Sequence, residues 1–142
     1  MAVGLQVSFD ARDPARLGAF WAELLGYVEQ PPPEGFASWP EALTAWGVPE
    51  DQQQSAYAVV DPAGVGPRLF FQQVPEHKTA KNRVHLDVNV GAGLADAERR
   101  AHIRAEVDRA VTLGATCLRE VEQRGELWVV LQDPDGNEFC LQ

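Results

Sequence analysis

The sequence predicts an α+β fold built from two tandem βαβββ modules, each a strand, a helix and three further strands. Two observations lead to this prediction. Each half of the chain opens with a strand of alternating polarity and continues into a helix that ends at a glycine. Each half also carries an Asp-Pro-x-Gly turn before its last strand, at residues 61–64 and 133–136. The halves are therefore interpreted as an internal duplication within a single domain covering residues 1–142.

The first module covers residues 1–75. Its opening strand alternates Leu5, Val7 and Phe9 with polar residues, and successive side chains of a strand point to opposite faces. Asp13-Pro14 is typical of a helix start, and Gly26 of a left-handed helix end. The remaining strands of this module are predicted over residues 27–30, 55–60 and 68–74.

Residues 31–54 interrupt this pattern and are interpreted as an insertion. Three prolines are followed by Phe36, Trp39 and Trp46 among Pro, Gly and acidic residues, with a short helix expected over 40–46. A segment of this length is typical either of a lid over a binding site or of a satellite hydrophobic cluster. The sequence leaves both alternatives open.

The second module covers residues 83–142 and follows a polar linker, residues 76–82. Its first strand is predicted over residues 83–90, with polar residues on one face. The other face of that strand consists of Val84, Leu86, Val88 and Val90. The buried face of the helix that follows is expected to consist of Ile103, Val107, Ala110 and Val111. The later strands are predicted over residues 115–121, 127–132 and 137–142.

Composition and charge exclude several classes of function. With 12 basic and 21 acidic residues the formal charge is −9, which opposes binding to nucleic acid or to an anionic membrane surface. The two cysteines are too few for a disulfide framework, and no stretch approaches the ~20 apolar residues of a membrane span. We therefore expect a cytoplasmic protein without nucleic-acid or membrane partners.

Three segments carry a family resemblance. They are Asp13 to Gly26 with its Phe20-Trp21 pair, Lys81 to Asp87, and Asp133 to Asn137 followed by Phe139. In this order and spacing the chain resembles the vicinal oxygen chelate superfamily of glyoxalases, bleomycin resistance proteins and extradiol dioxygenases. Within it, the chain is most similar to the glyoxalase-like domain branch. The resemblance covers nearly the whole chain.

The resemblance implies that two curved sheets enclose a cleft, with the helices packed outside. Alternation along the strands then assigns one face of each sheet to the core and the other to a small-molecule ligand. The residues expected in the core are Leu5, Val7, Phe9, Leu69, Phe71, Val84, Leu86, Val88, Phe139 and Leu141. The residues expected at the ligand are Gln6, Ser8, Phe70, Gln72, His85, Asp87, Glu138 and Cys140, with Trp39 and Trp46 from the insertion.

The resemblance also implies four metal-ligand positions, which fall on Gln6, Phe70, His85 and Cys140 in this chain. A phenylalanine cannot coordinate a cation, and Cys140 stands where a carboxylate is usual. We therefore expect no metal and no other cofactor. If a divalent metal did bind, its ligands would be Gln6, His85 and Glu138.

Without a metal, His85 and Glu138 are the candidate catalytic residues, because a histidine beside carboxylates can act as a general base near neutral pH. The same side chains could instead form a polar lining that only hydrogen-bonds a ligand. The resemblance thus implies a metal-independent isomerase or lyase, with an antibiotic-sequestering protein like the bleomycin resistance members as the alternative. The third hypothesis is a metal-dependent lyase or dioxygenase with altered metal ligands. The aromatic residues of the insertion also favour a homodimer.

Overall fold

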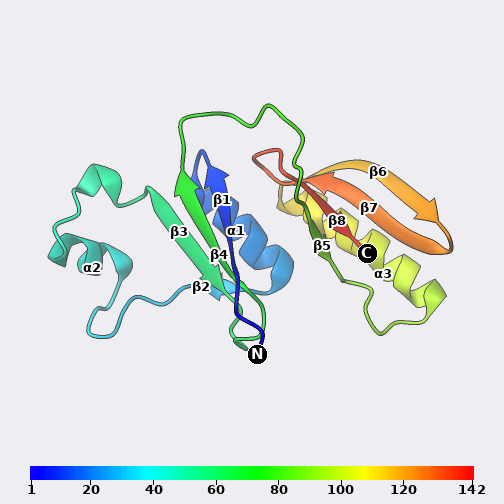
Figure 1. The fold of residues 1–142 in the computed structure, drawn as a ribbon, viewed down its shortest axis with the longest axis horizontal. Helices are drawn as coiled ribbons and strands as arrows, with labels where there is room; N and C mark the ends of the chain where they lie inside the picture. The colour runs from blue at the N-terminus through cyan, green and yellow to red at the C-terminus, as the bar shows by residue number, and fades with distance from the viewer. The chain divides into compact units, whose positions relative to one another are not determined.

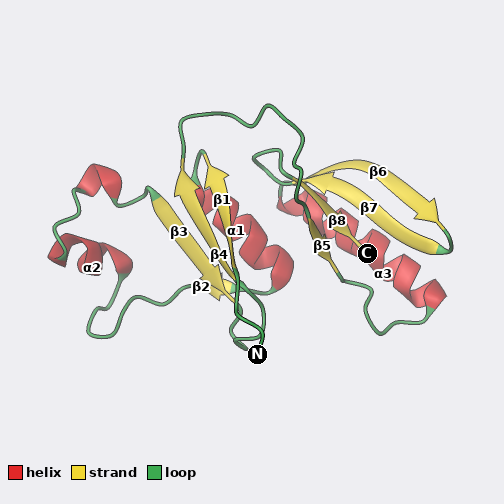
Figure 2. Cartoon of the chain, viewed as in Figure 1, coloured by secondary structure: helices red, strands yellow, loops and turns green.

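The computed structural model describes residues 1–142, which divide into two compact units, Met1–Glu76 and His77–Gln142. Each unit contains one four-stranded sheet with a long helix against one face (Figure 1; Figure 2). The order of elements is βαβββ in both units, and the first also contains a short helix and a 3-10 turn. The predicted α+β fold with two tandem βαβββ modules is therefore confirmed. No helix combines the length and the apolar character needed to cross a membrane.

The N-terminal sheet has the strand order β1-β4-β3-β2, with β1 and β4 parallel and the other neighbours antiparallel. The elements of this unit are β1 (Gln6–Ala11), α1 (Pro14–Leu25), β2 (Val28–Glu29), α2 (Trp39–Ala45), η1 (Glu50–Gln52), β3 (Ala56–Val60) and β4 (Arg68–Gln73). β2 pairs with β3 only at Val59 and Val60. One further backbone hydrogen bond joins Gln30 to Ala58, and the start of the outer edge of β3, residues 56 and 57, has no strand partner.

Helix α1 begins and ends where the sequence predicts. Asp13 caps the helix, because its carboxylate accepts a hydrogen bond from the Arg16 amide at 3.1 Å, and Pro14 occupies the first turn. Gly26 ends the helix with φ 72°, a left-handed conformation that glycine adopts without steric cost. Gly18 faces the sheet so closely that a Cβ there would lie 2.3 Å from the Tyr57 ring.

The core of the N-terminal unit lies between α1 and one face of the sheet. The Phe9 ring stacks on Phe71 at 4.9 Å between centroids and lies 5.3 Å from the Trp21 ring on α1. Val7 pairs in register with Leu69, and Phe9 with Phe71, so the residues between them on both strands point to the opposite face. We call that opposite side the open face of the N-terminal sheet. Its side chains on β1 and β4 are Gln6, Ser8, Asp10, Arg68, Phe70 and Gln72.

The insertion folds into α2, the η1 turn and an aromatic cluster. Ser38 caps α2 by accepting a hydrogen bond from the Glu41 amide at 3.3 Å. The Trp46 ring packs edge to face against Phe36 and Trp39, at 5.9 Å and 6.4 Å between centroids. Trp46 nevertheless remains 56% exposed. The predicted short helix is confirmed, and the aromatic side chains pack on one another.

The C-terminal sheet has the strand order β5-β8-β7-β6, with β5 and β8 parallel. The elements of this unit are β5 (Leu86–Val88), α3 (Asp96–Leu113), β6 (Thr116–Gln123), β7 (Glu126–Gln132) and β8 (Glu138–Leu141). Helix α3 buries Ile103, Val107 and Ala110. The buried Asp133 holds the turn before β8, because its carboxylate accepts hydrogen bonds from the Asn137 amide and side chain at 2.9–3.1 Å.

The strand predicted over residues 83–90 is shorter than expected, because β5 contains only Leu86–Val88. Pairing with β8 begins at Leu86 opposite Phe139, and β8 itself has four residues, so the segment before Leu86 has no partner. Val84 is therefore 82% exposed, and its predicted place in the core was wrong.

Two further core predictions were wrong. Leu5 is 70% exposed, because β4 begins at Arg68 and the preceding Pro67 offers no N–H for an earlier pairing. Val111 is 45% exposed, because it lies beside the narrow face through which α3 packs on the sheet.

Candidate functional site

A pocket of about 370 Å³ opens between the insertion and the outer edge of β3. It lies beside residues 56 and 57, because the main-chain hydrogen bonds of this edge end where the Gln30 amide meets Ala58 O. Three aromatic residues contribute to its wall, one from each of three elements: Trp39 of α2, Tyr57 of β3 and Phe70 of β4. Charged groups also line it, namely Arg68, Glu29 and Glu50. We call it the β3-edge pocket.

The half-buried guanidinium of Arg68 is held in place by two glutamines and an aromatic ring. Its Nε donates to Gln30 Oε1 at 2.6 Å, and its Nη1 donates to Gln6 Oε1 at 2.7 Å. Its central carbon lies 5.2 Å from the centroid of the Phe70 ring, a cation–π distance. Both hydrogen-bond acceptors are neutral amides, so these contacts orient the cation without neutralising its charge.

Gln30 connects this cation to the aromatic wall. Its backbone amide donates to Ala58 O at 2.9 Å, and its carbonyl accepts the indole N–H of Trp39 at 2.7 Å. Burial, followed by the negative charge of Glu29, raises the pKa of Tyr57 above its usual value. Tyr57 therefore keeps its hydroxyl proton at neutral pH and can donate a hydrogen bond.

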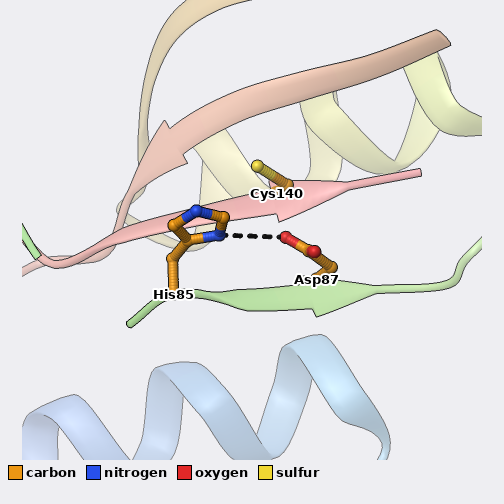
Figure 3. Close-up of side chains that lie close together, drawn as sticks. All are labelled: His85, Asp87 and Cys140. Atoms are coloured by element: carbon orange, nitrogen blue, oxygen red, sulfur yellow. Dashed lines mark hydrogen bonds and ion pairs between the residues drawn. The ribbon is translucent and has the colours of Figure 1, made fainter. Parts of the chain in front are cut away.

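A second group of reactive side chains lies on the C-terminal sheet (Figure 3). His85, Asp87 and Cys140 each offer one ligand or proton-transfer atom, and these atoms all lie within 4.8 Å of one another. They meet because Asp87 on β5 is the register partner of Cys140 on β8, and His85 precedes Asp87 by two residues. His85 Nδ1 lies 3.1 Å from Asp87 Oδ1, and both side chains are more than 40% exposed.

The thiol of Cys140 is not an activated nucleophile. Burial, followed by the charge of Asp87 and a hydrogen bond to its carboxylate, raises the pKa of Cys140 to about 11. At neutral pH the thiolate, which is the nucleophilic form of cysteine, is therefore scarce.

Glu138 lies in a separate contact that fastens residues 77–82 to β8. Its carboxylate accepts the Asn82 backbone N–H at 2.9 Å and pairs with the Lys78 ammonium at 3.0 Å. Burial acts to raise its pKa, but the Asn82 and Lys78 hydrogen bonds outweigh it and lower the pKa of Glu138 to about 2. A carboxylate this acidic stays ionised at neutral pH and is a weak base.

Comparison with known proteins decides the family. Residues 6–142 match the family model described as a glyoxalase-like domain. The chain belongs to the glyoxalase-like domain family. This match confirms the resemblance to the glyoxalase-like branch of the vicinal oxygen chelate superfamily. Solved structures of glyoxalase, bleomycin resistance and dioxygenase proteins share its fold. Among curated protein sequences, none matches the chain.

Three structural relatives illustrate the shared fold. A glyoxalase/bleomycin resistance/dioxygenase family enzyme from Burkholderia phytofirmans is 17% identical, with a TM-score of 0.60 over 96% of this chain and 94% of its own. A fosfomycin resistance protein from Listeria monocytogenes is 13% identical, with a TM-score of 0.63 over 100% and 92%. A glyoxalase-related enzyme from Fulvimarina pelagi is 17% identical, with a TM-score of 0.60 over 99% and 86%. At these identities the similarity establishes the fold alone.

The metal that the superfamily resemblance implies does not fit the four corresponding residues of this glyoxalase-like domain. Gln6 Oε1 accepts a hydrogen bond from the Arg68 guanidinium at 2.7 Å, so a fixed positive charge already lies beside this oxygen. Phe70 has no ligand atom, and Cys140 offers a thiol of raised pKa where a carboxylate is usual, so a metal would have to displace its proton. One other set of side chains could hold an ion, namely His85, Asp87 and Cys140. It could do so only after Cys140 loses its thiol proton.

The predicted site residues fall into separate groups within the two units. Phe70 and Trp39 share the β3-edge pocket, whereas Trp46 does not line it. Gln6 hydrogen-bonds Ser8 and Arg68, and Gln72 hydrogen-bonds Asp10 at 2.8 Å, all on the open face.

Sequence reasoning missed Arg68 and Tyr57. Arg68 was detectable, because it precedes Phe70 by two residues and must share its face. Tyr57 was not detectable from the sequence. It pairs in register with the core residue Phe71 and lines the pocket only because the edge of β3 beside it is open.

Proposed function

We propose that this protein binds a small organic molecule in the β3-edge pocket. The observation that carries the proposal is the lining of the pocket, which combines Trp39, Tyr57 and Phe70 with a few charged groups in about 370 Å³. Ligand sites typically measure about 300–1,000 Å³ and combine apolar walls with a few placed polar groups. The family resemblance implies a different site, a cleft enclosed by the two sheets, and that cleft remains a prediction.

The test is an NMR screen of small organic molecules that follows the indole N–H signal of Trp39. We expect binders to shift this signal, because that N–H bonds Gln30 O at the pocket wall. Phe70→Ala should weaken the same binders, since it removes one aromatic wall. Trp128→Phe is the control, because Trp128 lies on β7 of the other unit and does not line the pocket. Equal affinities of the wild type and Phe70→Ala for every binder would place the ligand elsewhere.

Acid–base catalysis at a separate site on the C-terminal unit is a second candidate function, favoured by the hydrogen bond between His85 and Asp87. Because a carboxylate only accepts, His85 Nδ1 carries the hydrogen and Nε2 is the acceptor in the neutral ring. Such a pair suits proton abstraction, which is the step that a metal-independent isomerase or lyase requires. Glu138, also predicted as catalytic, has surroundings that favour a structural role.

Sequestration in the β3-edge pocket without turnover is the alternative, as in the antibiotic-binding members of the superfamily. Incubating each molecule of the screen with a small amount of protein and following it by mass spectrometry distinguishes the two functions. Product formation that His85→Ala abolishes supports catalysis, whereas tight binding with no product supports sequestration. His102→Ala is the control, because His102 lies on the exposed side of α3.

A further inference from the structure

We infer that Arg68 is the anion-recognising residue of the β3-edge pocket, so that the ligand is a small organic acid with a flat apolar body. The anionic group is an oxyanion, either a carboxylate or a phosphonate. This inference rests on the proposed function, because it names the class of molecule that the pocket binds.

Arg68 retains its positive charge in the pocket, because no carboxylate is paired with it. Half-buried arginines of the C-terminal unit are paired with carboxylates: Arg99 with Glu126 at 2.9 Å and Arg100 with Glu122 at 3.0 Å. Arg68 is also half-buried, but its acceptors are the amide oxygens of Gln6 and Gln30. Glu29 and Glu50 line the same pocket, but neither forms an ion pair with Arg68, so its guanidinium stays available to the oxyanion of a ligand. In a chain of formal charge −9, such a cation indicates a binding role.

Arg68 also has N–H donors left for a ligand. A guanidinium has five N–H donors in one plane, and the two glutamines use two of those on Arg68. The free donors can form a charge-assisted pair of hydrogen bonds with an oxyanion. The two glutamines and the Phe70 ring already fix the orientation of the side chain. Little rotamer entropy is therefore lost when a ligand binds.

The pocket wall around Arg68 is mainly aromatic, which favours a flat apolar ligand body. Trp39, Tyr57 and Phe70 offer apolar area to the body of a ligand, and aromatic rings stack favourably on flat groups. Glu29 and Glu50 also line the pocket, and like charges repel. The ligand therefore carries a single anionic group at Arg68, and its other end is neutral or donates hydrogen bonds.

The experiment compares four probes of similar size: benzoate, phenylphosphonate, benzyl alcohol and benzylamine. Binding is measured from the Trp39 indole signal in the wild type, Arg68→Met, Arg68→Lys and Arg83→Met. Arg68→Met keeps the length of the side chain without its charge, and Arg68→Lys keeps the charge without the planar donors. Arg83→Met removes an exposed positive charge from the other unit and serves as the control. Thermal unfolding confirms that each variant is folded.

We expect at least one of the two anions to bind about tenfold more tightly than benzyl alcohol or benzylamine, and their ratio identifies the preferred oxyanion. Arg68→Met should weaken the anion by about 10- to 100-fold and leave benzyl alcohol nearly unchanged, because a hydrogen bond to a charged group contributes this much. Arg68→Lys should recover part of the affinity, and Arg83→Met should match the wild type.

Two outcomes overturn the inference. If the neutral or cationic probe binds as tightly as the anions, or if Arg68→Met leaves anion affinity unchanged, Arg68 does not recognise an anion, while small-molecule binding in the pocket still stands. If none of the four probes shifts the Trp39 signal, the organic-acid class is wrong, and the wider screen with Phe70→Ala then judges the proposed function separately.

Discussion

Replacing Glu138 by glutamine should destabilise the protein, because the carboxylate holds residues 77–82 against β8. The hydrogen bonds from Asn82 and Lys78 lower its pKa from the usual value of 4.5 to about 2. At about 1.36 kcal/mol for each pKa unit, this lowering sets an upper limit of about 3 kcal/mol on the stability that the carboxylate contributes at neutral pH. The side chains of Lys78 and Glu138 are 19% and 12% exposed, so solvent screens the pair in part. We therefore expect a smaller loss, of about 1–2 kcal/mol, in Glu138→Gln.

The sign of the pH dependence follows from the lowered pKa. The ionised carboxylate is stabilised in the folded state, so its contribution is complete above pH 4.5 and is lost as the pH falls toward about 2. The difference in unfolding free energy between the wild type and Glu138→Gln should thus be constant from pH 7 to 5. It should then shrink steadily between pH 4.5 and 2.

Urea unfolding followed by circular dichroism at pH 7, 5, 4 and 3 measures this difference. Glu76→Gln is the matched control, because it removes an exposed carboxylate beside the same segment and should change stability by less than about 0.5 kcal/mol. A difference that is as large at pH 3 as at pH 7 would show that the effect is not electrostatic. A difference near zero at neutral pH would show that the contact with Lys78 and Asn82 contributes nothing.

Three further predictions follow from other contacts. Gly18→Ala should destabilise the fold by about 1–2 kcal/mol in thermal unfolding, because the new Cβ would overlap the Tyr57 ring. The control Gly4→Ala, whose Cβ would meet no atom within 4 Å, should leave stability unchanged. The purified protein should contain less than about one equivalent of transition metal by elemental analysis, and stoichiometric metal that His85→Ala removes would contradict this. The exposed Trp46 supports the expected homodimer, burying more than roughly 1,200 Å² in total, and sedimentation that finds only monomer at micromolar concentration would oppose it.

The sequence by itself determined the features that depend on neighbouring residues. Asp13 and Gly26 define the ends of α1, because helix capping involves backbone groups within one turn. Alternation assigned Phe9 and Phe71 to the core face, because the direction of a side chain on a strand depends only on its position along that strand. The repeated order of elements then predicted two βαβββ units.

Only the tertiary structure decided which strand ends are paired and which charged groups meet. Val84 is exposed although its local pattern is that of a strand, because strand length is set by the partner, β8. Glu138 meets Lys78 across 60 residues of sequence, and Arg68 meets Gln6 across 62. A periodic pattern carries no information about such long-range partners, because they depend on how separate strands align. For the same reason the sequence showed Glu138 as a possible catalytic acid and left Arg68 unnoticed.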